Sequence, residues 1–228
     1  MFFYDSTFLL LIPAIIISMY AQQKIQSTFR KYSRVFSGGS YSGHDIARMI
    51  LDKNGLENIR IEHVRGNLTD HYDPRSGVLR LSDSVYGNRS IAAYGVAAHE
   101  VGHAIQHSKR YMPLEIRNSM APVVSFSSRV VWLIILLGFF LGIAGFIKIG
   151  VFLFLAVVIF QLVTLPVEFD ASSRAIVQLE SLGILYDDDI KGARKVLNAA
   201  ALTYVAAALT AVSQLVRLLI LSGYGRRD

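Results

Sequence analysis

The chain has 228 residues, no cysteine and a formal charge of +6, and 53% of its residues are apolar. Without cysteine it can form neither disulfides nor thiolate–metal bonds, so any zinc would be held by nitrogen and oxygen, as catalytic zinc often is. The positive charge does not indicate a nucleic-acid partner, because no basic run with interleaved aromatic residues occurs and the cations cluster beside apolar blocks. Length and composition together favour a small domain combined with membrane spans.

The first apolar block, residues 2–21, is long enough to cross a bilayer once. A cleaved signal peptide fits poorly, because no positive segment precedes the block and no small-residue cleavage site follows it. Four cations follow the block directly, namely Lys24, Arg30, Lys31 and Arg34. By the positive-inside rule, the segment after this span is expected in the cytoplasm.

Residues 22–128 are expected to form a small α+β cytoplasmic domain of the zincin type. Ser42 followed by Asp45 resembles a capping box that opens a helix. Residues 68–72 and 78–82 flank a turn-rich segment, and this pattern predicts a β-hairpin. Two roles remain open for residues 78–82: an ordinary sheet strand, or an edge strand that pairs with an extended substrate.

One helix is predicted over residues 90–107, which contain no proline and begin with a serine suited to an N-cap. This helix carries an H-E-x-x-H pattern in which His99 and His103 project from the same face and could hold one metal ion. The carboxylate of Glu100 could then reach a metal-bound water. The competing interpretation is a helix with two histidines that bind no metal. Gly95 and Gly102 either let a neighbouring helix or strand approach the metal closely or are simply tolerated.

Residues 130–167 form a 38-residue apolar run in which Lys148 is the only charge. A single helix of that length would be nearly twice as long as the hydrocarbon layer is thick, so the run is expected to fold back as a helical hairpin. The predicted spans are 130–147 and 150–167, with Gly145, Lys148 and Gly150 marking the turn.

The rest of the chain is predicted to contain a polar cytoplasmic segment, residues 168–198, and a fourth span, residues 199–221. The first half of that last block is rich in alanine and could instead pack as a soluble helix. Arg226 and Arg227 would then lie outside the cell, against the positive-inside rule. The predicted fold class is a mainly α membrane protein with about four transmembrane helices and a small α+β domain.

A catalytic zinc site needs a third protein ligand. His107 is too nearly collinear with the other two histidines on one straight helix, and the metzincin pattern is absent because Gln106 stands where that pattern requires glycine. His71 and Asp70 in the hairpin could reach the site, although surface and turn-capping roles explain them as well. Glu168 is favoured as the third ligand, because it lies on a separate segment that the hairpin brings back to the side on which His99 lies. The alternative is that Glu168 is a carboxylate at the membrane interface that begins a helix.

The sequence H-E-V-G-H, a following membrane hairpin and the sequence P-V-E-F-D-A resemble the YugP-type membrane zinc metallopeptidases. These are distant relatives of heat-shock protease X and the CAAX prenyl proteases within the gluzincins. The resemblance covers nearly the whole chain, including residues 69–74 and 96–106. It implies a zinc-dependent membrane endopeptidase that binds one zinc ion through His99, His103 and Glu168, with Glu100 as the general base.

The sequence departs from the prenyl protease pattern at one position. There an aspartate follows the ligand glutamate by one helical turn, whereas this chain has Ser172. Asp170 is therefore either a partner of a histidine ligand or a helix N-cap. A donor for the tetrahedral oxyanion is also expected, with Arg174, His71 and Tyr72 as candidates.

Together these features predict peptide hydrolysis at the cytoplasmic face of the cell membrane. The expected substrate is a peptide or a membrane-associated protein, and the protein is expected to be embedded in the lipid bilayer. One alternative is an intramembrane protease of the site-2 type. The charges of Arg89, Lys109 and Arg110 argue against it, because they bracket a helix too short to cross a bilayer. The other alternative is a membrane adaptor or chaperone-like regulator that binds zinc for structure, in which Glu100 would have no use as a base.

Overall fold

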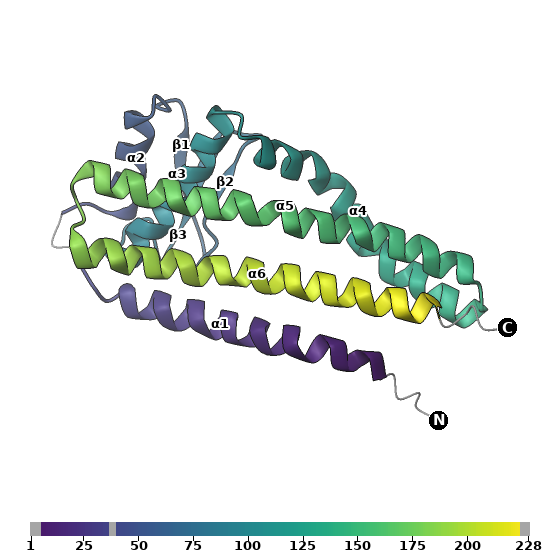
Figure 1. Cartoon of the computed structure of the whole chain (residues 1–228). Coiled ribbons are helices and arrows are strands. Elements are labelled where there is room, and N and C mark those ends of the chain that lie inside the picture. The colour runs from purple at the N-terminus through teal and green to yellow at the C-terminus, as the bar shows by residue number, and fades with distance from the viewer. Residues whose placement is uncertain (1–5, 37–39, 224–228) are drawn as a thin grey trace.

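The computed structural model describes residues 6–36 and 40–223, which form long helices with a small sheet at one end (Figure 1). In chain order the elements are η1 (Ser6–Leu11), α1 (Ile12–Tyr32), α2 (Gly43–Lys53), β1 (Arg60–Val64), β2 (His71–Asp73), β3 (Val78–Ser82), α3 (Ile91–Ser108), α4 (Met112–Leu141), α5 (Ala144–Leu182) and α6 (Asp187–Gly223). The sheet, α2 and α3 lie together at one end of the long helices. The predicted class, mainly α with a small sheet, is confirmed.

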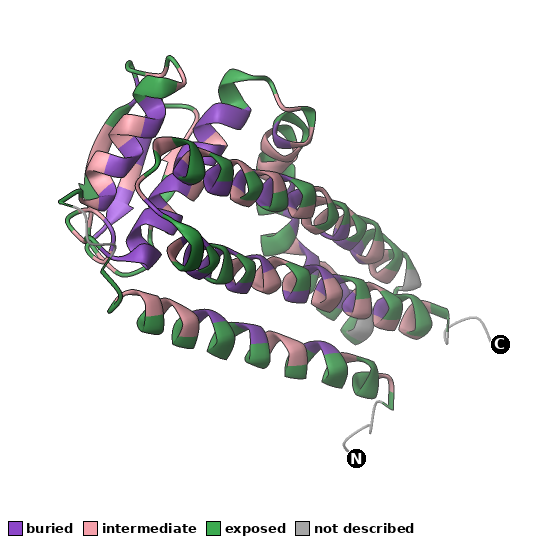
Figure 2. Cartoon of the chain, turned by 60° about the vertical axis from the view of Figure 1, so that its left-hand side comes forward, coloured by how far each residue is buried: buried purple, intermediate pink, exposed green. Residues whose placement is uncertain are grey.

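Four helices are long and apolar enough to cross a membrane, and they cover residues Ser6–Tyr32, Met112–Gly138, Gly145–Leu182 and Asp187–Gly223. Their outer sides are exposed along much of their length (Figure 2). Large apolar side chains lie there, such as Phe140 and Phe152, which are 84% and 75% exposed. Such a surface is costly in water and suits contact with lipid. Residues 2–5 of the first predicted span lie outside the described residues.

The α4 and α5 helices form the expected hairpin, but the turn lies earlier than predicted. The α4 helix ends at Leu141, and Gly142 adopts a left-handed φ of 66°. The prediction of a turn at residues 145–150 was wrong, because Gly142 supplies the conformation that ends a helix and Gly150 is needed for packing. A Cβ on Gly150 would have no room against Ile135 of α4.

The α5 helix continues through Pro166 to Leu182, so Glu168 lies within a long helix. It ends where Gly183 takes a left-handed φ of 65°. The predicted polar segment 168–198 therefore corresponds to the second part of α5, a short turn and the beginning of α6. Asp187 to Asp189 provide acidic side chains in the first turn of α6, where they suit the helix dipole.

The sheet has the order β1-β3-β2, with β1 parallel and β2 antiparallel to β3. The predicted hairpin of β2 and β3 is confirmed. The interpretation of residues 78–82 as an edge strand was wrong, because β3 pairs on both sides. Val78, Leu79 and Leu81 are fully buried, as expected of a central strand.

A shared hydrophobic core joins α2, the sheet, α3, α5 and α6. The predicted capping box opens α2, where the Asp45 amide donates to the Ser42 hydroxyl at 3.2 Å and the Ser42 amide donates to the Asp45 carboxylate at 2.8 Å. The α3 helix lies inside this core, and its residues Ile91 and Tyr94 are essentially without exposure. Close packing on several sides therefore holds α3 in place.

Candidate metal centre

The α3 helix presents His99 and His103 one turn apart. As predicted, the helix has an N-cap at Ser90, whose hydroxyl accepts a hydrogen bond from the Ala93 amide at 3.2 Å. The two imidazole rings lie edge to face with their centroids 4.8 Å apart. Each side chain is only 12% exposed. The histidines thus form a nearly buried pair on one side of α3.

Glu168 of α5 approaches this pair from the opposite side. Its Oε2 lies 3.2 Å from Nε2 of His99 and 3.6 Å from Nε2 of His103. One ligand atom from each of the three residues lies within 4.8 Å of the others. Ligands about 2.0–2.1 Å from a tetrahedral zinc ion are separated by roughly 3.3 Å, so these spacings fit a His-His-Glu site.

Charge at the site also suits a cation. A cavity of about 140 Å³ beside Glu168 is lined by three carboxyl side chains, Asp70, Glu100 and Glu168, and by one guanidinium, Arg117. Arg117 donates from Nη1 to Oε1 of Glu168 at 3.1 Å, so the other carboxylate oxygen faces the histidines. Burial opposes protonation of His103, but the neighbouring carboxylates outweigh it and raise the pKa of this imidazole. The same negative potential would stabilise a bound divalent cation.

Gly102 permits the close approach of α5 to α3. A Cβ at this position would lie 2.6 Å from the carbonyl oxygen of Ala171, which is three residues from Glu168. The expectation that Gly102 makes room for a neighbouring element is therefore confirmed. At Gly95, on the same helix, a Cβ would meet Ala193 of α6 at an ordinary 3.6 Å.

Gln106 fixes the orientation of His103. Its amide nitrogen donates both to the Val167 carbonyl at 2.8 Å and to the Asp170 carboxylate at 2.7 Å. The amide oxygen is 3.0 Å from Nδ1 of His103 and can only accept, so Nδ1 carries the proton. The lone pair of His103 is consequently on Nε2, the atom that faces Glu168.

Ser172 and Asp170 contact different histidines. Ser172, which stands at the aspartate position, has its hydroxyl 3.2 Å from Nδ1 of His99. Asp170 reaches the other histidine through Gln106. The alternative that Asp170 is a helix N-cap is wrong, because α5 begins at Ala144. Both histidines therefore have a side-chain partner behind the metal-facing nitrogen.

Glu100 lies beside the ligand group, on the same helix. Its Oε2 accepts a hydrogen bond from the backbone amide of Tyr72 in β2 at 3.1 Å. Its Oε1 makes no hydrogen bond with any described residue, so it is free to contact a water. Burial raises the pKa of the nearby Asp70 carboxyl, the charge of Glu100 adds to the rise, and hydrogen bonds from Ser82 oppose it.

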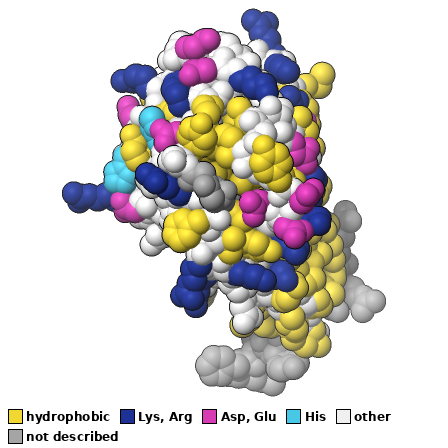
Figure 3. Space-filling view, turned by 90° about the vertical axis from the view of Figure 1, so that its left-hand side faces the viewer, with side chains coloured by type: hydrophobic (Ala, Val, Ile, Leu, Met, Phe, Trp, Pro, Cys, Tyr) yellow, Lys and Arg dark blue, Asp and Glu magenta, His cyan; other side chains and the backbone are white. Residues whose placement is uncertain are grey.

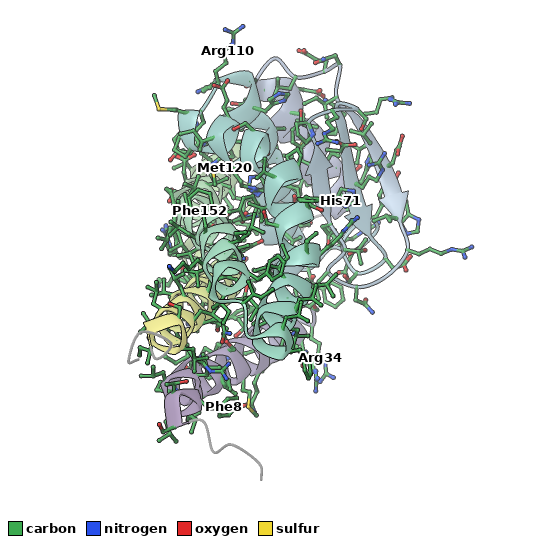
Figure 4. All side chains as sticks on the ribbon, turned by 90° about the vertical axis from the view of Figure 1, so that its right-hand side faces the viewer. Phe8, Arg34, His71, Arg110, Met120 and Phe152 are labelled. Carbon is green, nitrogen blue, oxygen red and sulfur yellow. The ribbon has the colours of Figure 1, made fainter. Side chains whose placement is uncertain are left out.

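Three other predicted residues have different partners. His107 has its Nδ1 3.0 Å from the hydroxyl of Tyr72 and is not in the ligand group. Arg174 forms a 2.6 Å ion pair with Asp170. His71 is the first residue of β2 and is labelled in Figure 4. It borders the 140 Å³ cavity, and its Nδ1 lies 2.9 Å from the Thr69 carbonyl oxygen. None of the three contributes to the group of His99, His103 and Glu168.

A second cavity of about 310 Å³ lies on the other side of Glu100, between α3 and the α1 and α6 helices. Its wall is mainly apolar and includes Ile25, Leu68 and Val196. Tyr204 of α6 lines both this cavity and the smaller one. The sequence analysis did not identify Tyr204 or Arg117 as residues of the site. The only signal in the sequence was that each is a polar or charged side chain within a largely apolar helix.

Comparisons with known proteins agree with this geometry. The family model described as "Putative neutral zinc metallopeptidase" matches residues 7–223. A Bacillus subtilis (strain 168) protein named "Putative membrane protease YugP" is 50% identical over 219 residues, which cover 96% of this chain and 97% of that protein. No solved structure matches the chain.

Proposed function

This chain belongs to the neutral zinc metallopeptidase family, and from that premise we propose that it is a zinc-dependent endopeptidase of the gluzincin type that cleaves peptide bonds at the cytoplasmic membrane face. The observation that carries the proposal is the convergence of Glu168 on His99 and His103, beside a free oxygen of Glu100. The substrate class is a peptide or a membrane-associated protein.

Zinc would be held by Nε2 of His99, Nε2 of His103 and one oxygen of Glu168. When bound, zinc supplies a Lewis acid that polarises a carbonyl group and makes a water molecule more acidic. Arg117 keeps the second oxygen of Glu168 engaged, which favours binding through one oxygen. Gln106 holds His103 in the tautomer that a metal requires.

Glu100 acts as the general base. Its free oxygen takes a proton from the attacking water and then delivers it to the leaving amine. The Tyr72 amide restrains the other oxygen, so the carboxylate keeps a fixed orientation. Tyr204 is our candidate donor to the oxyanion, because its side chain borders the cavities on both sides of Glu100 and its hydroxyl group can donate a hydrogen bond.

The cytoplasmic orientation rests on the charges that follow the first apolar block. Lys24, Arg30, Lys31 and Arg34 lie in or just after the C-terminal part of α1, which is the end of α1 nearest the sheet and α2 (Figure 1). The positive-inside rule assigns this end to the cytoplasm. The metal centre, on α3, would then face the cytoplasm near the membrane surface.

Cleavage of unfolded casein by the detergent-purified full chain tests the proposal. We expect fragments that disappear when a zinc chelator is added and return when zinc is restored. Glu100→Gln should lower the rate by about 10²- to 10⁴-fold and leave the zinc content unchanged. Fragments that persist in the chelator, or a Glu100→Gln variant that cleaves at the full rate, would contradict the mechanism. Zinc binding without any cleavage would favour the adaptor function.

A further inference from the structure

A third cavity, separate from the metal centre, lies between α1 and α6. It has a volume of about 540 Å³. Each helix contributes one stripe with the spacing i, i+3, i+4, i+7, which places all four residues of a stripe on one face. The stripes are Lys24, Ser27, Thr28 and Lys31 on α1, and Lys195, Asn198, Ala199 and Leu202 on α6.

Contacts between the two helices close this α1–α6 groove at both ends. At the end near the sheet, the ring of Tyr32 packs so closely on Gly192 that a Cβ there would lie 2.8 Å from it. At the other end, the hydroxyls of Ser18 and Thr210 are 3.2 Å apart. The groove is therefore a surface groove between two helices that contact each other on both sides of it.

The three lysines of the groove form no close ion pair with any described residue. Within the described part of the chain, Lys24, Lys31 and Lys195 form no ion pair. No acidic residue occurs from position 6 to 44 or from 190 to 227. On α6, Lys191 forms a 2.8 Å ion pair with Asp188, and Lys195 interacts with the same carboxylate only at longer range. Three ammonium groups that line one groove create a positive potential that attracts an anion.

The groove also offers neutral hydrogen-bonding groups. The side chains of Thr28 and Asn198 make no hydrogen bonds with described residues, although both border the groove. A hydroxyl and an amide beside three ammonium groups are the groups that bind phosphate oxygens. A tetrahedral phosphate group offers more acceptor oxygens than a carboxylate, so it can use more of these donors.

The position of the groove places it at the edge of the bilayer. The apolar part of α1 ends at Ala21, and Lys24 follows within one turn. Figure 3 shows Lys and Arg side chains near the boundary between the charged end of the molecule and the apolar surface of the long helices. The apolar side chains of Ala199 and Leu202 lie further along α6, in the direction of the membrane part.

We propose that the α1–α6 groove is a binding site for a phosphate group, carried either by an anionic phospholipid headgroup or by a soluble phosphate. The groove uses a different side of α1 from the 310 Å³ cavity beside Glu100, which contacts Gln22 and Ile25. A ligand in the groove would join α1 and α6, which both also line that 310 Å³ cavity. The site thus links the surface of the membrane to the walls of the catalytic cavity.

Binding of three probes to the delipidated full chain in detergent tests the site: phosphatidylglycerol, phosphatidylcholine and inorganic phosphate. We expect phosphatidylglycerol to bind more tightly than phosphatidylcholine in native mass spectrometry. Replacement of all three lysines, Lys24→Gln, Lys31→Gln and Lys195→Gln, should weaken this binding roughly a hundredfold, at about fivefold per charge. Tight binding of inorganic phosphate by calorimetry, lost in the same variant, would instead identify the soluble source.

The matched control removes three exposed arginines elsewhere, by Arg60→Gln, Arg75→Gln and Arg89→Gln. It should bind the probes as the unmodified chain does. A lysine-to-arginine variant at the three groove positions should keep binding, which separates loss of charge from loss of fold. Equal binding by the glutamine groove variant and the unmodified chain would overturn the proposal, and so would equal losses in the groove and control variants.

Discussion

Gly102→Ala tests the close approach of α3 and α5 directly. The added Cβ would lie 2.6 Å from the Ala171 carbonyl oxygen, which must retreat by about 0.8 Å to reach the ordinary contact distance of 3.4 Å. Zinc sites tolerate ligand shifts of about 0.2 Å. Because Glu168 lies on the same helix, one turn before Ala171, we expect it to move with that carbonyl and zinc affinity to fall by about tenfold or more.

Gly95→Ala is the matched control, since its Cβ would meet Ala193 at 3.6 Å without displacement. Both substitutions should raise the free energy of unfolding by about 1 kcal/mol, because alanine favours the helix more than glycine does. Only Gly102→Ala should also lower it by about 1–3 kcal/mol through overpacking. The control should therefore unfold at a higher temperature than Gly102→Ala and should keep the zinc affinity of the unmodified chain. Zinc is measured by competition with a fluorescent chelator. Equal zinc affinity in the two variants would refute the view that Gly102 sets the distance from α3 to Glu168.

Two further substitutions test residues that support the site. Gln106→Met removes the acceptor of the His103 Nδ1 proton and leaves Asp170 without that amide donor. Zinc affinity should therefore fall by about 10- to 100-fold. An unchanged affinity in the chelator competition would mean that the tautomer of His103 is fixed in another way. Tyr204→Phe removes one hydroxyl next to Glu100 and should lower kcat by about 10²- to 10³-fold, with zinc content and KM little changed. A normal kcat for casein cleavage would exclude Tyr204 as the oxyanion donor.

The parts of the structure that could be predicted from the sequence are those set by local spacing. His99 and His103 share a face because four residues make about one turn, and the N-cap at Ser90 marks the start of their helix. The β-hairpin follows from a turn-rich segment between two short strands. Glu168 could be proposed only because an apolar run too long for one span must fold back.

The rest depended on contacts between distant elements. Several glycines occur near the hairpin turn, and the sequence does not show that Gly142 ends α4 while Gly150 is packed against Ile135. The position of β3 in the middle of the sheet depends on β1, which pairs with it from a separate segment. Arg117 reaches Glu168 from a third helix, and no local pattern indicates such an approach.

The shared core of α3, α5 and α6 means that the metal-site part of this protein is not an independent unit. A fragment with residues 22–128 would contain the H-E-x-x-H helix but would lack Glu168, the carboxylate that completes the ligand group. It would also uncover the faces of α3 that pack on Ala175 and Leu179 of α5 and on Ala193 of α6. We therefore expect such a fragment not to fold alone, and we expect bulky substitutions on the buried faces of α3 to disturb α5 and α6 as well.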